Sequence, residues 1–182
     1  MKIIIQRVHQ AKVSVDNKVV SNIGNGLLVL LGITHDDTKA DSVYLAQKLL
    51  NIRLWPDIQE VKGVTQRKPW MKSVMQMNYD LLIVSQFTLY HKMKGNRPGF
   101  HNARGHEEAK EMYHEFIQMV KDGYEQHKVQ MGAFGKYMNV ELQNDGPVTI
   151  AMDSVKDPKI VHKLEKEERR MLKMQQQKRK NN

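Results

Sequence analysis

The alternation of apolar and polar positions in the first third of the chain predicts strands. Short stretches rich in β-branched residues occur at 2–8, 12–16 and 18–21, and such stretches favour an extended backbone. Residues 27–33 (LLVLLGI) form a continuous apolar run, which is typical of a buried strand. We therefore expect the chain to begin with a β-sheet that contributes to the core.

Two longer segments carry apolar residues at spacings of three and four, which predicts helices. The first helix should run through 40–50 behind the candidate capping residues 36–38 (DDT). It should end before Pro56, because proline disfavours helix in the residue ahead of it. The second should cover about 106–124, with one apolar stripe that faces the core.

The remaining segments predict more strands. Residues 80–90 (DLLIVSQFTLY) begin as a buried strand, 91–105 are polar and glycine-rich like a loop, and 61–77 show no clear pattern. Three strands are expected near the end, at 129–134, 137–143 and 148–152. Strands and helices do not alternate regularly, so we expect an α+β domain with largely antiparallel, barrel-like sheets and two main helices.

Composition and charge divide the chain into a domain and an extension. With 182 residues, of which 40% are hydrophobic, the chain can bury one core, which we place at 1–153. The extension at 154–182 carries most of the net charge, because Lys156 to Asn182 hold ten Lys/Arg against four Asp/Glu, +6 of a total +9. Such an extension suits contacts to nucleic-acid phosphates, or it is a solvated helix without a partner.

Several classes of chemistry have no support in the sequence. The chain has no cysteine, so it offers no disulfide, thiolate zinc site or cysteine nucleophile, which fits a reducing cytosol. The motifs of serine hydrolases, zinc proteases and phosphate loops are absent, and the histidines are not spaced as metal ligands. Apolar runs are too short for a signal peptide or a membrane span. We expect a soluble, cytoplasmic protein without a metal, cofactor or membrane contact.

Two polar segments are candidates for a site. Ser85, Gln86 and Thr88 follow directly after the apolar run 81–84, and polar groups at the end of a buried strand need partners or a ligand. They can offer hydroxyls, an amide and main-chain N–H groups to a substrate, or belong to a strand that emerges into solvent. The second segment, 144–149 (NDGPVT), predicts a turn, or a recognition site built from exposed backbone carbonyls.

SQFTL and NDGPVT, in this order and separation, resemble the signature motifs of the D-aminoacyl-tRNA deacylases, the D-tyrosyl-tRNA deacylase family. The opening MKIIIQRVHQAKVSVDNKVV and the GLLVLLGI strand extend the resemblance over roughly 1–153. It implies a homodimer that hydrolyses the ester between a D-amino acid and the terminal adenosine of tRNA, with aminoacyl-tRNA as its partner. The ribose 2′-hydroxyl of the substrate and main-chain groups would assist, without a cofactor.

The resemblance also implies roles for the residues of the first motif. Ser85, Gln86 and Phe87 would line the pocket, and Thr88 would shape it. Backbone N–H groups near Phe87 and Thr88 would stabilise the developing oxyanion. Phe134 is expected to stack on the terminal adenine, or else to belong to the core.

The second motif would select the handedness of the substrate. Gly146 and Pro147, joined by a cis bond, would reach into the partner's site, bind the amino group and collide with the side chain of an L-residue. Glycyl-tRNA is then a predicted second substrate. Arg7 matches an arginine that helps to hold this segment, or it is an ordinary strand-edge charge.

Two alternatives stay open. In a sibling class of deacylases the Gly-Pro bond is trans and some L-residues are tolerated, although Arg7 argues against this class. The other alternative is a non-catalytic nucleic-acid-binding module that acts through the basic extension.

Overall fold

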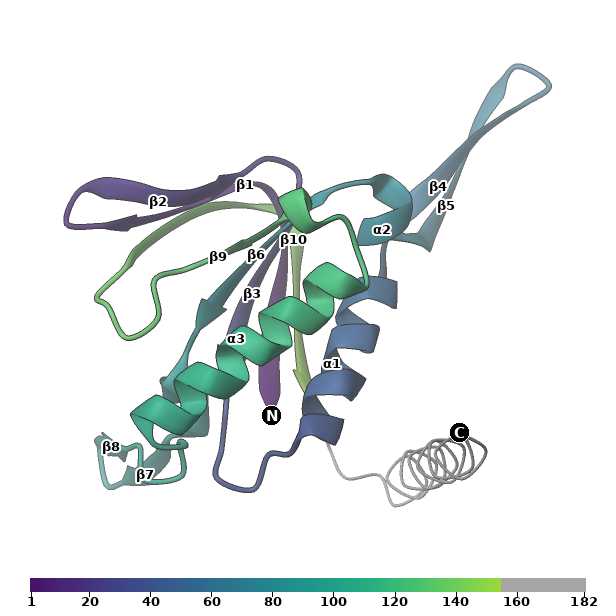
Figure 1. Ribbon diagram of the computed structural model, residues 1–182. Coiled ribbons are helices and arrows are strands. Elements are labelled where there is room, and N and C mark those ends of the chain that lie inside the picture. Colours follow the sequence, from purple (N-terminus) through teal and green to yellow (C-terminus); the bar gives the residue numbers. More distant parts are fainter. Residues whose placement is uncertain (155–182) are drawn as a thin grey trace, which may run out of the picture.

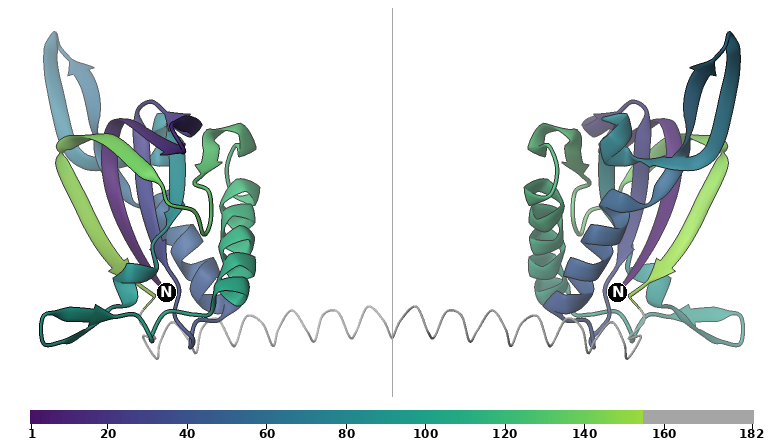
Figure 2. Two further views of the ribbon diagram at one scale, coloured as in Figure 1. Left: turned by 90° about the vertical axis from the view of Figure 1, so that its left-hand side faces the viewer. Right: turned by 90° about the vertical axis from the view of Figure 1, so that its right-hand side faces the viewer.

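A computed structural model gives the fold of residues 1–154 (Figure 1). The predicted extension lies, apart from Ser154, outside the described residues. The main element is a six-stranded sheet. Five of its strands lie side by side in the order β10 (Asn139–Asp153), β1 (Lys2–Val15), β3 (Gly26–Gly32), β6 (Asp80–Ser85) and β9 (Val129–Met131). The sixth strand, β2 (Lys18–Ile23), pairs with β1. Helices α1 (Lys39–Asn51) and α3 (His106–Asp122) lie on the same side of this sheet (Figure 2).

The sheet confirms the predicted α+β class with two main helices, and it curves into a nearly closed, barrel-like arrangement. Strand β1 runs antiparallel to β2, β3 and β10, whereas β6 is parallel to β3 and β9. The parallel pairs have a simple cause. The chain passes from β3 to β6 through α1 and from β6 to β9 through α3, and helical crossovers bring a strand back in the same direction.

The core lies between the sheet and the two helices. Alternate residues of β1 and β3 face α1 and α3, and the fully buried members include Ile3, Ile5, Leu27, Val29, Leu45, Leu49, Tyr113, Phe116 and Val120. Leu28 and Leu82 lie in a second buried cluster, so β3 and β6 are covered on both faces, as their continuous apolar runs predict. The Tyr113 hydroxyl donates to the Ile83 carbonyl over 2.8 Å, which gives this buried polar group a partner.

The start and end of α1 agree with the sequence. Thr38 is the N-cap, and its backbone N–H and its hydroxyl donate to the Asp41 carboxylate over 2.8 and 2.7 Å. Partial burial raises the pKa of Asp41, but hydrogen bonds from Thr38 and Ser154 and the nearby N-terminal ammonium outweigh it and lower the pKa. The helix ends at Asn51, before Pro56.

Two strand predictions were wrong in how they divided the chain. Segments 2–8 and 12–16 fall on one strand, β1, which ends at Val15 and has irregular pairing near its middle. Segments 137–143 and 148–152 likewise fall on one strand, β10, which begins at Asn139, and the expected turn at 144–147 is a bulge inside it. Gln6 pairs with Thr149 and Val8 with Asn144, so Arg7 alone lies opposite residues 145–148 of β10. Pairing with β1 on both sides keeps the strand direction.

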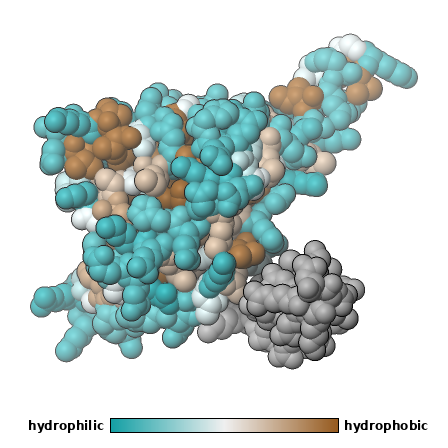
Figure 3. Space-filling model, in the orientation of Figure 1, coloured by the Kyte–Doolittle hydropathy of each residue, from teal (hydrophilic) through white to brown (hydrophobic). Residues whose placement is uncertain are grey.

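Other segments contain structure that the sequence did not reveal. Residues 61–77 contribute to a hairpin of β4 (Arg53–Val61) and β5 (Val64–Ser73) and to the short helix α2 (Val74–Met77). The predicted loop 91–105 contains a small hairpin of β7 (Lys92–Lys94) and β8 (Arg97–Gly99). Figure 3 shows apolar side chains exposed on the β4–β5 hairpin, among them Ile58, Val61 and Val64. Strands exposed on both faces need no alternation of apolar and polar residues, so the usual strand pattern is missing.

No helix in residues 1–154 is long and apolar enough to cross a bilayer.

Candidate active site

The first candidate motif lies where β6 ends against β3. Ser85 is the last residue of β6, and the Gln86 N–H donates to the Leu31 carbonyl over 2.7 Å. The chain then turns into a 3-10 helix, η1 (Phe87–Tyr90), rather than continuing as a strand into solvent. Gly32 permits this turn, because a Cβ there would lie 2.9 Å from Leu89 Cβ and 3.1 Å from the Gln86 carbonyl oxygen.

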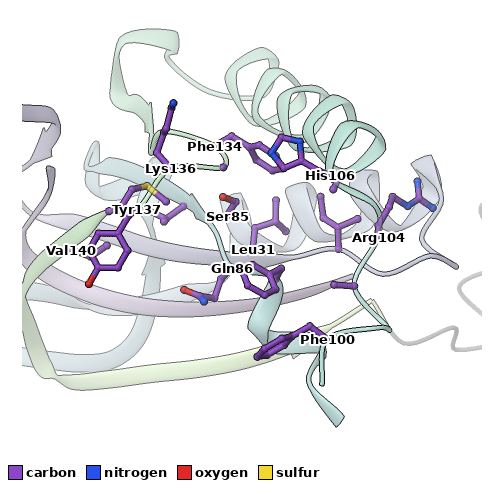
Figure 4. A pocket seen from close by; sticks show the side chains of 17 residues that line it. Leu31, Ser85, Gln86, Phe100, Arg104, His106, Phe134, Lys136, Tyr137 and Val140 are labelled. Atoms are coloured by element: carbon purple, nitrogen blue, oxygen red, sulfur yellow. The ribbon is translucent and has the colours of Figure 1, made fainter. Parts of the chain in front are cut away.

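The end of β6 and the start of η1 form one wall of a cavity of about 650 Å³ (Figure 4). Of the predicted site residues, the structure brings Ser85, Gln86, Phe87 and Phe134 together in its lining. Most other lining residues are apolar, from Leu31 and Ile33 of the β3 end to Met138 and Val140 of the chain entering β10. An apolar cavity with a few convergent polar groups is the usual form of a small-ligand site.

Thr88 does not line the cavity, but it fixes a residue that does. The Gln86 side-chain amide donates to the Thr88 hydroxyl over 2.5 Å, which holds the Gln86 amide in one orientation. The backbone N–H groups of Phe87 and Thr88 have no acceptor within residues 1–154. The Phe87 N–H is therefore a free donor at the cavity wall, and the free Thr88 N–H follows it along the chain at the start of η1, where an anionic oxygen can accept hydrogen bonds.

The opposite wall is the loop between β9 and β10. Phe134 is half-buried, with its ring centroid 5.2 Å from that of Tyr113 and 5.3 Å from that of His106. It therefore contacts the core and also lines the cavity, so the two expectations for this residue are compatible. Gly135 has φ +71° and presses against α3, because a Cβ there would lie 2.6 Å from His106 Nε2. A side chain at this position would meet the exposed His106 ring, and it would be strained by the positive φ.

The cavity is lined by basic side chains that sequence reasoning missed. Arg104, His106 and Lys136 line it, and no carboxylate does. Arg104 Nε donates to the Thr34 carbonyl over 3.1 Å, and its Nη2 donates to two further carbonyls of the same loop at 2.6 Å each. A hydrogen bond from His106 at 2.8 Å lowers the pKa of the exposed Glu107. In the sequence, only Gly132 and Gly135 indicate that the loop between β9 and β10 is constrained.

The second motif lies elsewhere on the single chain. Gly146 and Pro147 are exposed in the β10 bulge and do not line the cavity. Their peptide bond is cis, the state that the resemblance implies. The bulge is closed by Asn144, whose side-chain oxygen accepts from the Val148 N–H over 3.1 Å. The turn chemistry of this asparagine was thus predicted correctly, although the chain does not reverse.

Arg7 lies opposite the bulge. Its Nε is 2.9 Å from Asp145 Oδ2, as an ion pair without hydrogen-bond alignment, and its Nη1 donates to the Leu54 carbonyl. Gly146 has φ +114°, and a Cβ there would lie 3.0 Å from Arg7 Nη2 and from Val148 Cγ2. The structure therefore places Arg7 in contact with the Gly146 backbone and away from the cavity.

In residues 1–154, no three His, Asp or Glu side chains come together as a metal site would need.

Comparison with known proteins identifies the family. The family model for D-Tyr-tRNA(Tyr) deacylase matches residues 4–153. A D-aminoacyl-tRNA deacylase of Dictyostelium discoideum is 46% identical over 154 residues, which cover 85% of this chain and 98% of the relative. D-aminoacyl-tRNA deacylase 1 of Homo sapiens is 42% identical over 176 residues, which cover 93% of this chain and 81% of the relative.

Two solved structures share the fold of this chain. A structure of the c-Myc DNA Unwinding Element Binding Protein superposes with a TM-score of 0.76 at 42% identity and covers 84% of this chain and 98% of that one. A structure described as a probable eukaryotic D-amino acid tRNA deacylase shares the fold, with a TM-score of 0.68 at 21% identity and the same coverage of 84% and 98%. The chain belongs to the D-Tyr-tRNA(Tyr) deacylase family.

Proposed function

We propose that this protein hydrolyses the ester that joins a D-amino acid to the terminal adenosine of tRNA and releases the free amino acid. One observation carries the proposal: relatives more than 40% identical over 81–98% of their length are named D-aminoacyl-tRNA deacylases. The cavity beside Ser85 and Gln86 supports it, because its apolar walls and few polar groups suit an aminoacyl-adenosine.

The proposed reaction requires no nucleophilic side chain of the protein. Ser85 makes no hydrogen bond to a histidine in the described part of the chain, so no serine–histidine pair is in place to form a nucleophile. A water oxygen, assisted by the ribose 2′-hydroxyl, adds to the ester carbonyl, and the ribose 3′-oxygen leaves with a proton. The N–H groups of Phe87 and Thr88 stabilise the oxyanion between these steps.

Recognition of the amino acid is assigned to a second copy of the chain. Gly146 and Pro147 are exposed and outside their own cavity, so they are free to enter the cavity of a partner in a homodimer. Their carbonyls bind the substrate's amino group, and their backbone occupies the space that an L side chain needs. Arg7 holds the segment in this position through Asp145.

Phe134 is assigned to the adenine of the substrate. Its ring lines the cavity and rests on Tyr113, so its position is fixed before the substrate binds. Because tRNA is the substrate, we further propose that the protein works in the cytoplasm.

The test is the release of labelled tyrosine from D-tyrosyl-tRNA and L-tyrosyl-tRNA by the purified chain, with and without a chelator. We expect loss of the D-ester only, unaffected by the chelator. If both esters stay intact while the protein is folded, the proposed function is wrong.

A second candidate is nucleic-acid binding through the basic extension. It is favoured by the net +6 charge of 156–182 and by a 42% identical relative described as a DNA unwinding element binding protein. It predicts salt-dependent binding of DNA or RNA that is lost when 156–182 are removed, whereas deacylation survives this truncation.

A further inference from the structure

The loop between β9 and β10 holds an aromatic ring and an amine at the edge of the cavity. Tyr137 is 89% exposed, although it also lines the cavity. Figure 4 shows it across the cavity from His106, with the neighbouring Lys136 directed outward. The ring is therefore accessible to a ligand that extends beyond the cavity.

The loop is held in place, so the exposure of Tyr137 is set by the fold. The Gly132 N–H donates to the Ile83 carbonyl over 2.8 Å, and the Lys136 N–H donates to the Ala133 carbonyl over 3.2 Å. Gly135 rests directly against His106. The ring of Tyr137 is therefore presented from a fixed backbone, which lowers the entropy lost when a ligand binds to it.

Charge identifies the kind of ligand. Lys136 forms no ion pair with any residue of 1–154, and no carboxylate lines the cavity. Arg104 adds a second positive charge, although its guanidinium is bonded to carbonyls. An exposed aromatic ring beside an unpaired cation is the combination by which proteins bind single-stranded nucleic acid, through base stacking and phosphate contact.

We propose that Tyr137 and Lys136 form a subsite for the nucleotide that precedes the terminal adenosine of tRNA. Tyr137 stacks on its base, and Lys136 binds the phosphate between it and the adenosine. This inference rests on the proposed function, because it requires the terminal adenosine in the cavity of 650 Å³ that these residues border. Both are positioning residues and take no part in the chemistry.

The test compares D-tyrosyl-tRNA with D-tyrosyl-adenosine, which lacks the preceding nucleotide. Tyr137→Ala should raise KM for the tRNA substrate about tenfold with little change in kcat, and raise KM for the adenosine ester much less. Tyr137→Phe should behave like the unaltered protein, because the ring is retained.

Lys136→Gln should also raise KM for the tRNA substrate more than KM for the adenosine ester. It should reduce the slope of log KM against log salt concentration by about 0.7, the value for one phosphate of a single strand. Lys62→Gln is the matched control, because this exposed lysine lies at the tip of the β4–β5 hairpin, on the other side of the molecule (Figure 1).

Equal effects of Tyr137→Ala on both substrates, or on neither, overturn the inference. If the unaltered protein hydrolyses neither ester, the proposed function fails. Binding of a short single-stranded RNA then decides the subsite separately: a tenfold weaker affinity of Tyr137→Ala supports it, and an unchanged affinity overturns it.

Discussion

Arg7 and Asp145 face each other across β1 and β10, with Arg7 Nε 2.9 Å from Asp145 Oδ2. Their side chains are only 11% and 25% exposed, so solvent screens this pair less than the surface pairs of the chain. Asp145 directly precedes Gly146, and Arg7 also donates to the Leu54 carbonyl. Arg7 therefore ties the exposed Gly-Pro segment to the body of the domain.

Replacing Arg7 by lysine should lower kcat/KM for D-tyrosyl-tRNA about tenfold, because an ammonium cannot reach both Asp145 and the Leu54 carbonyl as a guanidinium does. The measurement is the rate of ester hydrolysis at low substrate concentration. Lys12→Ala is the control, since it breaks an exposed pair with Glu141 between the same two strands, and such pairs contribute little. Equal effects of the two variants would contradict the role of Arg7.

Gly146→Ala should reduce hydrolysis of D-tyrosyl-tRNA at least about tenfold, because its Cβ would meet Arg7 Nη2 and Val148 Cγ2 at 3.0 Å and its φ of +114° disfavours a side chain. The control is Gly24→Ala, where no atom lies within 4 Å of the added Cβ. Thermal unfolding of both variants separates lost activity from lost folding. Full activity of a folded Gly146→Ala protein would rule out this segment as part of the site.

Glycyl-tRNA should be hydrolysed, whereas L-alanyl-tRNA should not. Selection by collision excludes a side chain in the L position, and glycine has none to exclude. The two rates are compared under the same conditions as for D-alanyl-tRNA. Complete resistance of glycyl-tRNA would show that handedness is recognised through a contact to the D side chain instead.

Asp41→Ala should lower the free energy of unfolding by about 1 kcal/mol at neutral pH through loss of the capping box. Because the folded state lowers the pKa of Asp41 below 3.8, its contribution is present above that pH and is lost as the pH falls through the folded-state pKa. Denaturant unfolding at neutral and acidic pH measures this difference. Asp36→Ala, which removes an exposed carboxylate outside the cap, should show no such dependence.

The sequence predicts the parts of the fold that depend on local periodicity. The stripe that contains Tyr113 and Phe116 defines α3, and the run 27–31 defines a strand buried on both faces. The bulge at 144–147 was read as a turn because Asn144 does have turn chemistry. Only pairing with β1, at the other end of the chain, keeps the direction of β10.

The residues of the candidate site also divide into those that the local sequence predicts and those that only the fold brings together. Ser85 and Gln86 were found because polar residues follow a buried strand, which is visible locally. Arg104, His106 and Lys136 come from two separate segments that meet only in the folded chain. In the sequence alone, these three residues cannot be distinguished from ordinary polar residues of the surface.

The central claim is that the cavity of one chain and the Gly-Pro segment of another act as one site. The most direct measurement mixes two variants, Gln86→Trp, whose large ring fills part of the cavity, and Gly146→Ala; each alone should hydrolyse D-tyrosyl-tRNA at least about tenfold more slowly. A mixed dimer contains one site with both parts intact, so unfolding and refolding the two together should restore about a quarter of the original activity. If mixed dimers form and activity does not return, the two segments do not share a site between chains.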